Sequence, residues 1–387
     1  MPYLTKTAIL FLFVCSLTVT HLFAQDEGIF LGPSLYAPTP TSVNVWWHIK
    51  HDEKEHQVLY GTNRKKLDQE VGLQETTGYP HVELTGLAAG TTYYYQVKSG
   101  SAVSEVYSFN LPDPDKPFRM VFWSDNQNGF ETFGNKTVPL MMEQEPDLLL
   151  TAGDLVSNGA EYEHWDKHLY GPAKELFSSV PWYPVRGNHD YDPNSDLCYK
   201  MLPLPETDHY YAKSYGPLCI LIIDSNEDTE AQWAWLEEQL QNEAWKNAKF
   251  RMVAFHHPAF NSLWDSPSID GRALYRSTLV PMLEDAYGDI VINGHMHAYE
   301  RLRRLMGNDE FIEYVIIGGA GGTLDTVPVY QWPFSVVKYS THHILVADID
   351  EEKMMLKMIE LDTEKILDTF MIPANKADEE KATGKTE

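Results

Sequence analysis

Five short apolar runs, each followed directly by a polar segment, constrain what this chain can fold into. Such runs are typical of buried strands, because they are short, continuous and rich in branched and aromatic residues. Side chains that follow the strands converge at one edge of a sheet, where open α/β folds place their sites. The paired runs and segments are FRMVFW with SDNQ, DLLLTA with GDLVSNG, WYPV with GNHD, RMVAF with HHP, and GDIVIN with GHMHAYER.

The polar segments offer the carboxylate, amide and imidazole groups that two adjacent metal ions need. Asp154 suits a bridging position, because the two oxygens of a carboxylate can serve two ions. Asn188 adds a neutral amide oxygen, and His256, His295 and His297 add imidazole nitrogens suited to zinc, iron or manganese. The sequence therefore predicts a dinuclear metal site.

Charge excludes some partners. The formal net charge of -26 over 387 residues argues against nucleic acid or an anionic membrane as a partner. It also repels phosphate esters at long range, so bound metals would have to supply the attraction locally.

Residues 1–24 are predicted to be a signal peptide. Lys6 precedes an apolar stretch from Ala8 to Phe23, and Ala24-Gln25 offers a small-residue cleavage point. An uncleaved anchor is the other interpretation, but the stretch is short for a spanning helix. We expect a secreted or periplasmic protein with no stable membrane span after signal removal.

Two cysteines remain after the signal peptide, Cys198 and Cys219. In an oxidising compartment they could pair. They could equally be two buried thiols, since Cys219 lies inside the apolar run LCILIID. Both interpretations stay open at this point.

The pattern predicts two folded parts. Residues 28–112 alternate in period two and form a small all-β domain, and LPDPDKP is the linker. The segment LTGLAAGTTYYYQV resembles the corner of fibronectin type III domains. Its tyrosines are expected in the core, with a carbohydrate-stacking patch as the alternative.

The second part, residues 118–373, alternates strands with helices. The clearest predicted helix covers residues 230–248. EYVIIGGAGG predicts a strand and a tight glycine turn, and HHILVADID with MMLKMIEL predicts closing antiparallel strands. Residues 374–387 are charged and are predicted to be disordered.

From residue 118 onward, the five motifs resemble the calcineurin-like metallophosphoesterases, and within them the purple acid phosphatases. The resemblance implies an α/β (α+β) β-sandwich flanked by helices and a dinuclear centre of iron, zinc or manganese. Carried over by motif, Asp125, Asp154 and His297 would hold the first metal. Asp154, Asn188, His256 and His295 would hold the second.

His189 matches the residue that contacts the phosphate or protonates the leaving group, and Asp190 would orient it. Asn188 and His189 would also bind substrate. Arg272, in a loop after the His256 motif, is a further candidate for pairing with phosphate. His257 adjoins a ligand but should point away along the strand, so we do not expect it to take part in the chemistry.

The two more serious departures from the family pattern both weaken the first metal position. Ser157 stands where purple acid phosphatases have a tyrosine ligand. Gln127 stands where the wider superfamily often has a histidine, and it could coordinate a metal or only form hydrogen bonds.

The predicted function is hydrolysis of a phosphate monoester by an exported enzyme that uses metal-bound hydroxide. The alternatives are a phosphodiesterase on the same core, and an exported binding or adhesion protein whose metal site has degenerated. The oligomeric state is not predicted.

Overall fold

The computed structural model describes residues 29–202, 204, 209–262, 273–307, 310–326 and 331–374. The predicted signal peptide and nearly all of the predicted tail lie outside these ranges. None of the helices within them has the length and apolar character needed to cross a membrane.

The N-terminal part is built from strands alone, as its alternating pattern predicts. Tyr93 and Tyr95 on the sixth strand lie in its core, which confirms their predicted burial. The strands are β1 (Ile29–Thr39), β2 (Ser42–Ile49), β3 (Glu53–Gly61), β4 (Gln69–Thr77), β5 (His81–Thr85), β6 (Thr91–Ser99), β7 (Ala102–Val103) and β8 (Tyr107–Leu111).

The second part alternates strands and helices. Its strands are β9 (Phe118–Trp123), β10 (Leu148–Thr151), β11 (Trp182–Tyr183), β12 (Tyr211–Tyr215), β13 (Leu218–Ile222), β14 (Phe250–Ala254), β15 (Ile290–Asn293), β16 (Tyr299–Gly307), β17 (Glu310–Ile317), β18 (Ser335–Tyr339), β19 (His343–Ile349), β20 (Lys353–Glu360) and β21 (Ile366–Pro373). All five apolar runs of the sequence contribute a strand: β9, β10, β11, β14 and β15.

The helices of the second part are short. They are α1 (Phe130–Thr132), α2 (Val138–Glu143), α3 (Tyr162–His164), α4 (Lys174–Phe177), α5 (Leu197–Met201), α6 (Glu230–Gln241), α7 (Glu243–Lys246) and α8 (Val280–Asp285), with π-helical segments at Phe133–Thr137, Trp165–Tyr170 and Tyr275–Leu279. The single helix predicted over residues 230–248 is therefore two helices. Asn242 is extended between them, and its side chain accepts a hydrogen bond from Ala244 N.

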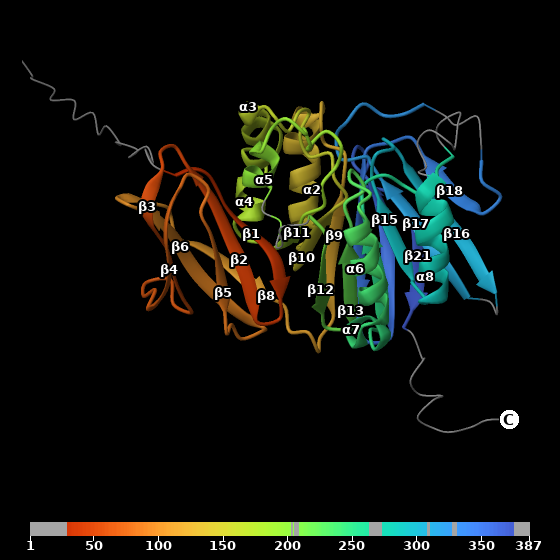
Figure 1. Cartoon of the computed structure of the whole chain (residues 1–387), viewed down its shortest axis with the longest axis horizontal. Helices are drawn as coiled ribbons and strands as arrows, with labels where there is room; N and C mark the ends of the chain where they lie inside the picture. Colours follow the sequence, from red (N-terminus) through yellow and green to blue (C-terminus); the bar gives the residue numbers. More distant parts are fainter. Residues whose placement is uncertain are drawn as a thin grey trace, which may run out of the picture.

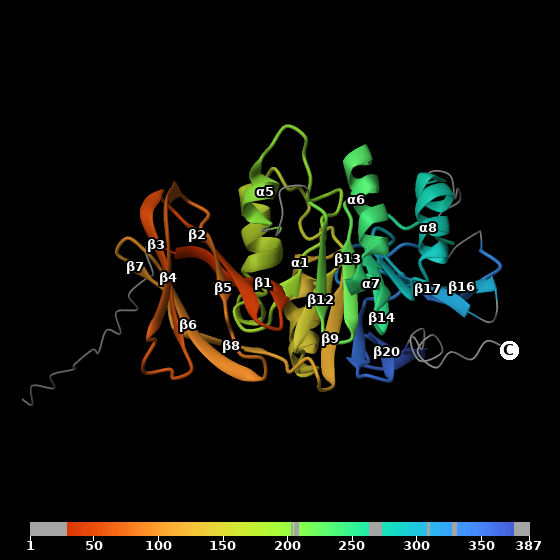
Figure 2. The ribbon, with the colours of Figure 1, turned by 60° about the horizontal axis from the view of Figure 1, so that its bottom comes forward.

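Two large sheets and one small sheet organise the chain. The nine-stranded sheet has the order β21-β20-β19-β9-β10-β11-β1-β2-β5, and the seven-stranded sheet has the order β12-β13-β14-β15-β17-β16-β18. The remaining sheet, β4-β3-β6-β7 with β8 beside β6, lies at one end of the molecule, and β16 lies at the other (Figures 1 and 2).

The two parts of the chain share a hydrogen-bonded sheet. Strand β1 runs parallel to β11, with Tyr36 opposite Trp182. The linker at residues 111–117 therefore separates the parts in sequence, although their strands are continuous in space. The N-terminal part directly supports the strand that leads into GNHD.

The two large sheets pack face to face, and helices cover their outer faces. In β9, Met120 and Phe122 point into the core between the sheets, while Val121 and Trp123 point outward. In β14, Met252 points inward and Val253 packs with the α6 side. Burial on both faces explains why these strands are continuous apolar runs. The predicted β-sandwich flanked by helices is confirmed.

The two cysteines are separate buried thiols. Cys198 in α5 packs in the core outside the nine-stranded sheet, and Cys219 in β13 packs outside the seven-stranded one. The sandwich lies between these layers, so the disulfide interpretation is wrong.

A buried ion network ties the two sheets together. Glu313 on β17 is fully buried, and it accepts from Arg303 Nε at 2.7 Å and Arg301 Nη1 at 3.3 Å. Arg301 also donates from Nε to Asp368 Oδ2, at 2.6 Å, on β21 of the other sheet. The network compensates a carboxylate that burial would otherwise make costly.

We predict that Glu313→Gln lowers the free energy of unfolding by about 3 kcal/mol, because it leaves Arg301 and Arg303 without their shared anion. Chemical denaturation followed by circular dichroism measures this change. Glu163→Gln, which breaks an exposed pair with Lys167, is the control and should leave the midpoint unchanged. Equal midpoints for both variants would show that the network does not stabilise the fold.

We predict an acid-sensitive contribution from His343, which is fully buried and approaches Gly319 closely. Burial lowers the pKa of His343 from its ordinary 6.5 to about 4. Between these values the unfolded chain binds a proton here that the folded chain does not. Stability therefore falls as pH falls, by about 1.4 kcal/mol per pH unit from this group.

Denaturant unfolding at several pH values tests this contribution. His343→Asn keeps a donor for the Thr341 carbonyl but cannot titrate, so its stability should fall less steeply with acid than that of the wild type. Parallel slopes for the two proteins over pH 4 to 6.5 would contradict the assignment.

Candidate metal centre

The ends of strands from both large sheets converge on one site. Asp125, Asp154 and Asn188 follow β9, β10 and β11, which run parallel in the nine-stranded sheet. His256 follows β14, and the GHMH segment follows β15 in the seven-stranded sheet. Parallel strands place their carboxyl ends at one edge, which brings five segments far apart in sequence together.

Around His256, three of the predicted ligands meet at one nitrogen. His256 Nε2 lies 3.2 Å from Asp154 Oδ2, 3.0 Å from Asn188 Oδ1 and 3.2 Å from His295 Nδ1. On the other side of the ring, Nδ1 lies 2.7 Å from the carbonyl oxygen of Ala152. That contact orients the ring so that Nε2 faces the convergence point. We call this group the second metal position.

Asp125 and His297 form the other side of the centre. His297 Nε2 lies 3.6 Å from Asp125 Oδ1, and His297 Nδ1 donates to the carbonyl of Thr323 at 2.6 Å. The backbone N–H of His297 donates to Asp325 Oδ2 at 2.8 Å. We call Asp125 and His297, with the shared Asp154, the first metal position.

The residues that orient His297 were not predicted from the sequence. Thr323 and Asp325 follow the glycine-rich loop after β17, which was interpreted only as a tight turn. The loop does turn, and it also packs against the centre, because Gly322 N donates to the Asp125 carbonyl at 2.8 Å. The signal available in the sequence was Asp325, a carboxylate three positions after the last glycine of the loop.

Gln127 contacts both positions through its amide. Its Nε2 donates to Asp154 Oδ2 at 3.0 Å and lies 2.8 Å from His297 Nε2. Its Oε1 is buried and has no hydrogen-bond partner among the described residues. A half-turn of the amide would exchange its oxygen and nitrogen and place Oε1 beside Asp154 and His297. A ligand role requires that turned orientation, whereas a hydrogen-bonding role uses the present one.

The backbone at the centre is strained. Asp125, Asp154 and His295 have φ of 62°, 53° and 70°, which non-glycine residues seldom adopt. Such conformations persist where the surrounding structure enforces them, and they cluster at functional sites. The backbone also passes so close to the two carboxylates that only glycine fits at two positions. A Cβ on Gly187 would lie 2.2 Å from Asp154 Oδ1, and a Cβ on Gly294 would lie 2.5 Å from Asp125 Oδ2.

The electrostatics fit a cation. With Nδ1 of His256 donating to a carbonyl, its Nε2 lone pair would face the oxygens of Asp154 and Asn188 unless a cation lies between them. Burial lowers the pKa of His256, but Asp154, Asp125 and the Ala152 carbonyl together outweigh burial and raise the pKa to about 9. A proton there supplies the charge that a metal ion would supply. Burial lowers the pKa of His295 to about 3, which keeps that imidazole neutral and able to bind a metal.

His189 and Asp190 lie beside the second position with different partners from those predicted. Asp190 is fully buried and accepts from Leu155 N, Val156 N and Gly187 N at 2.8, 3.1 and 2.8 Å. The ring of His189 instead meets a carbonyl, with Nδ1 3.1 Å from Ser157 O. Asp190 thus joins the Asp154 loop to the Asn188 loop, and Ser157 provides the contact that orients His189.

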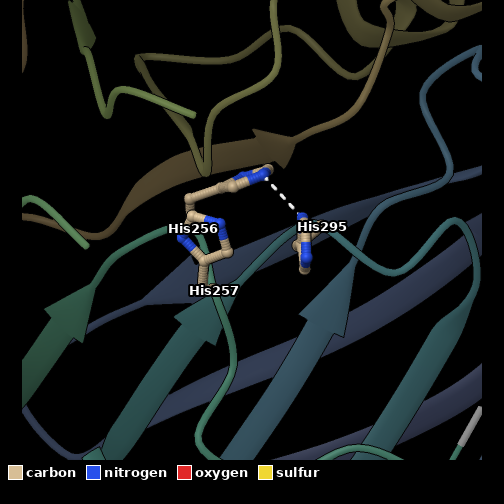
Figure 3. A group of neighbouring side chains, drawn as sticks. All are labelled: His256, His257 and His295. Atoms are coloured by element: carbon tan, nitrogen blue, oxygen red, sulfur yellow. Dashed lines mark hydrogen bonds between the residues drawn. The ribbon is translucent and has the colours of Figure 1, made fainter. Parts of the chain in front are cut away.

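The prediction for His257 was wrong. The strand ends at Ala254, so the alternation that would turn His257 away no longer holds. Figure 3 shows its ring beside those of His256 and His295.

Arg272, the candidate for pairing with phosphate, lies outside the described residues.

Comparisons with known families agree with this architecture. The purple acid phosphatase N-terminal domain matches residues 32–111, and the calcineurin-like phosphoesterase domain matches residues 118–299. Together these two domains account for most of the chain. The second match contains every predicted metal ligand.

Among curated relatives, purple acid phosphatase 23 of Arabidopsis thaliana is 27% identical over 298 residues, 64% of this chain and 63% of the relative. The phosphoenolpyruvate phosphatase of Allium cepa is 24% identical over 301 residues, 68% of this chain and 60% of the relative. The chain thus spans less than two-thirds of either protein.

Solved structures establish the fold. Purple acid phosphatase PPD1 from yellow lupin (Lupinus luteus) superimposes with a TM-score of 0.78 at 18% identity, over 89% of this chain and 74% of the lupin chain. PhoD superimposes with a TM-score of 0.68 at 13% identity, over 90% of this chain and 88% of that chain.

We predict that Asp190→Asn weakens metal binding at least about tenfold, because an amide cannot accept from all three backbone N–H groups and the two ligand loops would separate. Competition with a coloured chelator for Zn²⁺ measures the affinity. Asp192→Asn is the control, because this half-buried carboxylate two residues away accepts from the neighbouring Asn194 and not from the ligand loops. The same Zn²⁺ affinity in both variants would remove Asp190 from the support of the centre.

Proposed function

Because the chain belongs to the calcineurin-like phosphoesterases of the purple acid phosphatase type, we propose that it is an exported phosphatase that hydrolyses phosphate monoesters at a two-metal centre. One observation carries the proposal. A carboxylate, an amide oxygen and an imidazole converge within 3.2 Å of His256 Nε2, which is a donor set for a transition metal ion.

In this proposal each position has its own ligands. Asp125 and His297 would hold the first ion, with Gln127 as a weak neutral ligand in its turned orientation. Asn188, His256 and His295 would hold the second ion, and Asp154 would serve both. Bound ions would neutralise the charge on the phosphoryl oxygens and lower the pKa of a bound water molecule.

In this proposal Asn188 and His189 position the ester, and His189 donates the proton that the leaving alcohol needs. A carbonyl can only accept, so His189 Nδ1 carries a proton toward Ser157 O, and Nε2 is the nitrogen that would protonate the leaving alcohol. The backbone N–H of His189 donates to Asp154 Oδ1 at 2.8 Å and holds the residue beside the bridge. The proposed role of Asn188 in binding substrate follows from its half-buried place at the same loop.

The net charge of -26 makes the centre necessary for binding. A phosphate ester approaching this protein is repelled until it reaches the local positive charge of the metals. Activity should therefore disappear when metals are removed, even if the fold is intact.

The experiment is a pair of assays, on p-nitrophenyl phosphate and bis-p-nitrophenyl phosphate, with manganese, zinc or iron supplied to chelator-treated protein. We expect metal-dependent hydrolysis of the monoester. Asn188→Ala and His295→Ala should each lower kcat/KM by about a hundredfold or more, because each removes a ligand. His81→Ala, at an exposed residue of β5 remote in sequence from the motifs, is the control.

The outcomes separate the candidate functions. A marked preference for the diester would replace the monoester proposal and keep the metal centre. Full activity of Asn188→Ala at saturating metal would refute the ligand assignment. Purified wild-type protein that binds no metal and hydrolyses neither ester would favour the binding protein with a degenerate centre, which the Ser157 and Gln127 positions motivate.

A further inference from the structure

A third imidazole stands at the second metal position. The rings of His257 and His295 are 4.4 Å apart, and those of His257 and His256 are 4.9 Å apart. One potential ligand atom from each of the three residues lies within 4.8 Å of the other two. Figure 3 shows the His257 ring directed toward the other two rather than away from them.

The backbone explains how two consecutive histidines reach the same site. In a continuing strand they would point to opposite faces of the sheet. Here β14 ends at Ala254, and the chain bends while the His256 carbonyl accepts from Gly294 N at 3.0 Å. The rings of His256 and His257 are then nearly perpendicular, at 80°, on one side of the chain.

Ser225, which follows β13, holds the third imidazole in place. His257 Nδ1 lies 2.8 Å from Ser225 Oγ, and the backbone N–H of His257 donates to the same oxygen at 3.0 Å. Histidine ligands commonly have one ring nitrogen held in this way by a partner outside the metal shell. Ala152 does the same for His256, and Thr323 for His297.

We propose that His257 is a third imidazole ligand of the second metal ion, beside His256 and His295. This inference rests on the proposed metal centre. Three nitrogens spread evenly around one ion at about 2.1 Å lie about 3.6 Å apart, so binding would draw the His257 nitrogen closer to the other two by up to roughly 1.2 Å. With the carboxylate of Asp154 and the amide oxygen of Asn188, three imidazoles would give five donors, a set suited to a divalent transition ion of the zinc class.

Zinc affinity of the apo protein tests the proposal without relying on catalysis. Chelator competition should show that His257→Ala weakens one of two Zn²⁺ sites at least about tenfold. Ser225→Ala, which only releases the ring, should weaken the same site less. His81→Ala is the unchanged control, and His256→Ala is the control that must lose the site.

Cobalt substitution gives a second readout. The visible absorption of bound Co²⁺ should change in band position or intensity in His257→Ala, because a nitrogen ligand is lost, while far-UV circular dichroism stays that of the wild type. A folded His257→Ala protein with unaltered Zn²⁺ affinity and an unaltered Co²⁺ spectrum would overturn the proposal. A raised KM with unaltered metal binding would likewise overturn it and place His257 on the substrate phosphate instead.

The two proposals fail differently. If the wild type binds no metal, the proposed function and the role of His257 fall together. If the wild type binds two ions and only His256→Ala loses one, the metal centre stands and the His257 inference alone is wrong.

Discussion

The rest of the structure depends on the burial of two carboxylates, because their negative charges must be compensated inside the protein. Asp125 and Asp154 are 0% and 1% exposed, and within the described ranges neither forms an ion pair with lysine or arginine. Burial raises the pKa of Asp125, as expected for a charge removed from water. The negative charges of Asp125 and Asp154 can be compensated by nearby imidazoles and backbone N–H groups, or by cations bound to the two carboxylates. Ions bound at the proposed centre would therefore also stabilise the fold.

The sandwich makes such a site possible because each sheet brings its own ligands. The nine-stranded sheet supplies the carboxylates and Asn188, and the seven-stranded sheet supplies the imidazoles. Strand β11, which leads into Asn188, is only two residues long. It is held by the N-terminal part, through Trp182 Nε1 to Ser34 Oγ at 2.9 Å and Tyr183 OH to the Pro38 carbonyl at 2.9 Å. The all-β part thus contributes to the centre without supplying a ligand.

Much of this could be predicted from the sequence, because the signals were local. Apolar runs predicted the strands, and the candidate ligands were taken from their places after those strands. The fold and the division of the candidate ligands between two positions were what the family resemblance implied. The errors came where tertiary contacts decide. His257 was misplaced because strand alternation was extended past the end of β14, and Asn242 divides a helix that the apolar spacing alone would continue.

Other structural features, namely one strand pairing, one carbonyl contact and the left-handed backbone at two residues, could not be predicted from a single sequence. The pairing of β1 with β11 joins residues 146 positions apart, at Tyr36 and Trp182. The contact of Ser157 O with His189 uses a carbonyl, which every residue has, so no residue type marks it. The left-handed backbone at Asp125 and Asp154 likewise depends on neighbours that arrive from distant segments.

The two metal positions are unequal, and this inequality bears on how the centre works. The first position has the imidazole of His297, the carboxylate of Asp125, the shared carboxylate of Asp154, and Gln127, whose side-chain amide must turn over before its oxygen can bind. The second has two imidazoles, an amide oxygen and the shared carboxylate, with a third imidazole in the further inference. Since imidazole nitrogen binds zinc-class ions more strongly than a neutral amide oxygen does, the second position should fill first. The ion there would then fix Asp154 in the orientation that the first ion needs, which couples occupancy of the weaker position to that of the stronger.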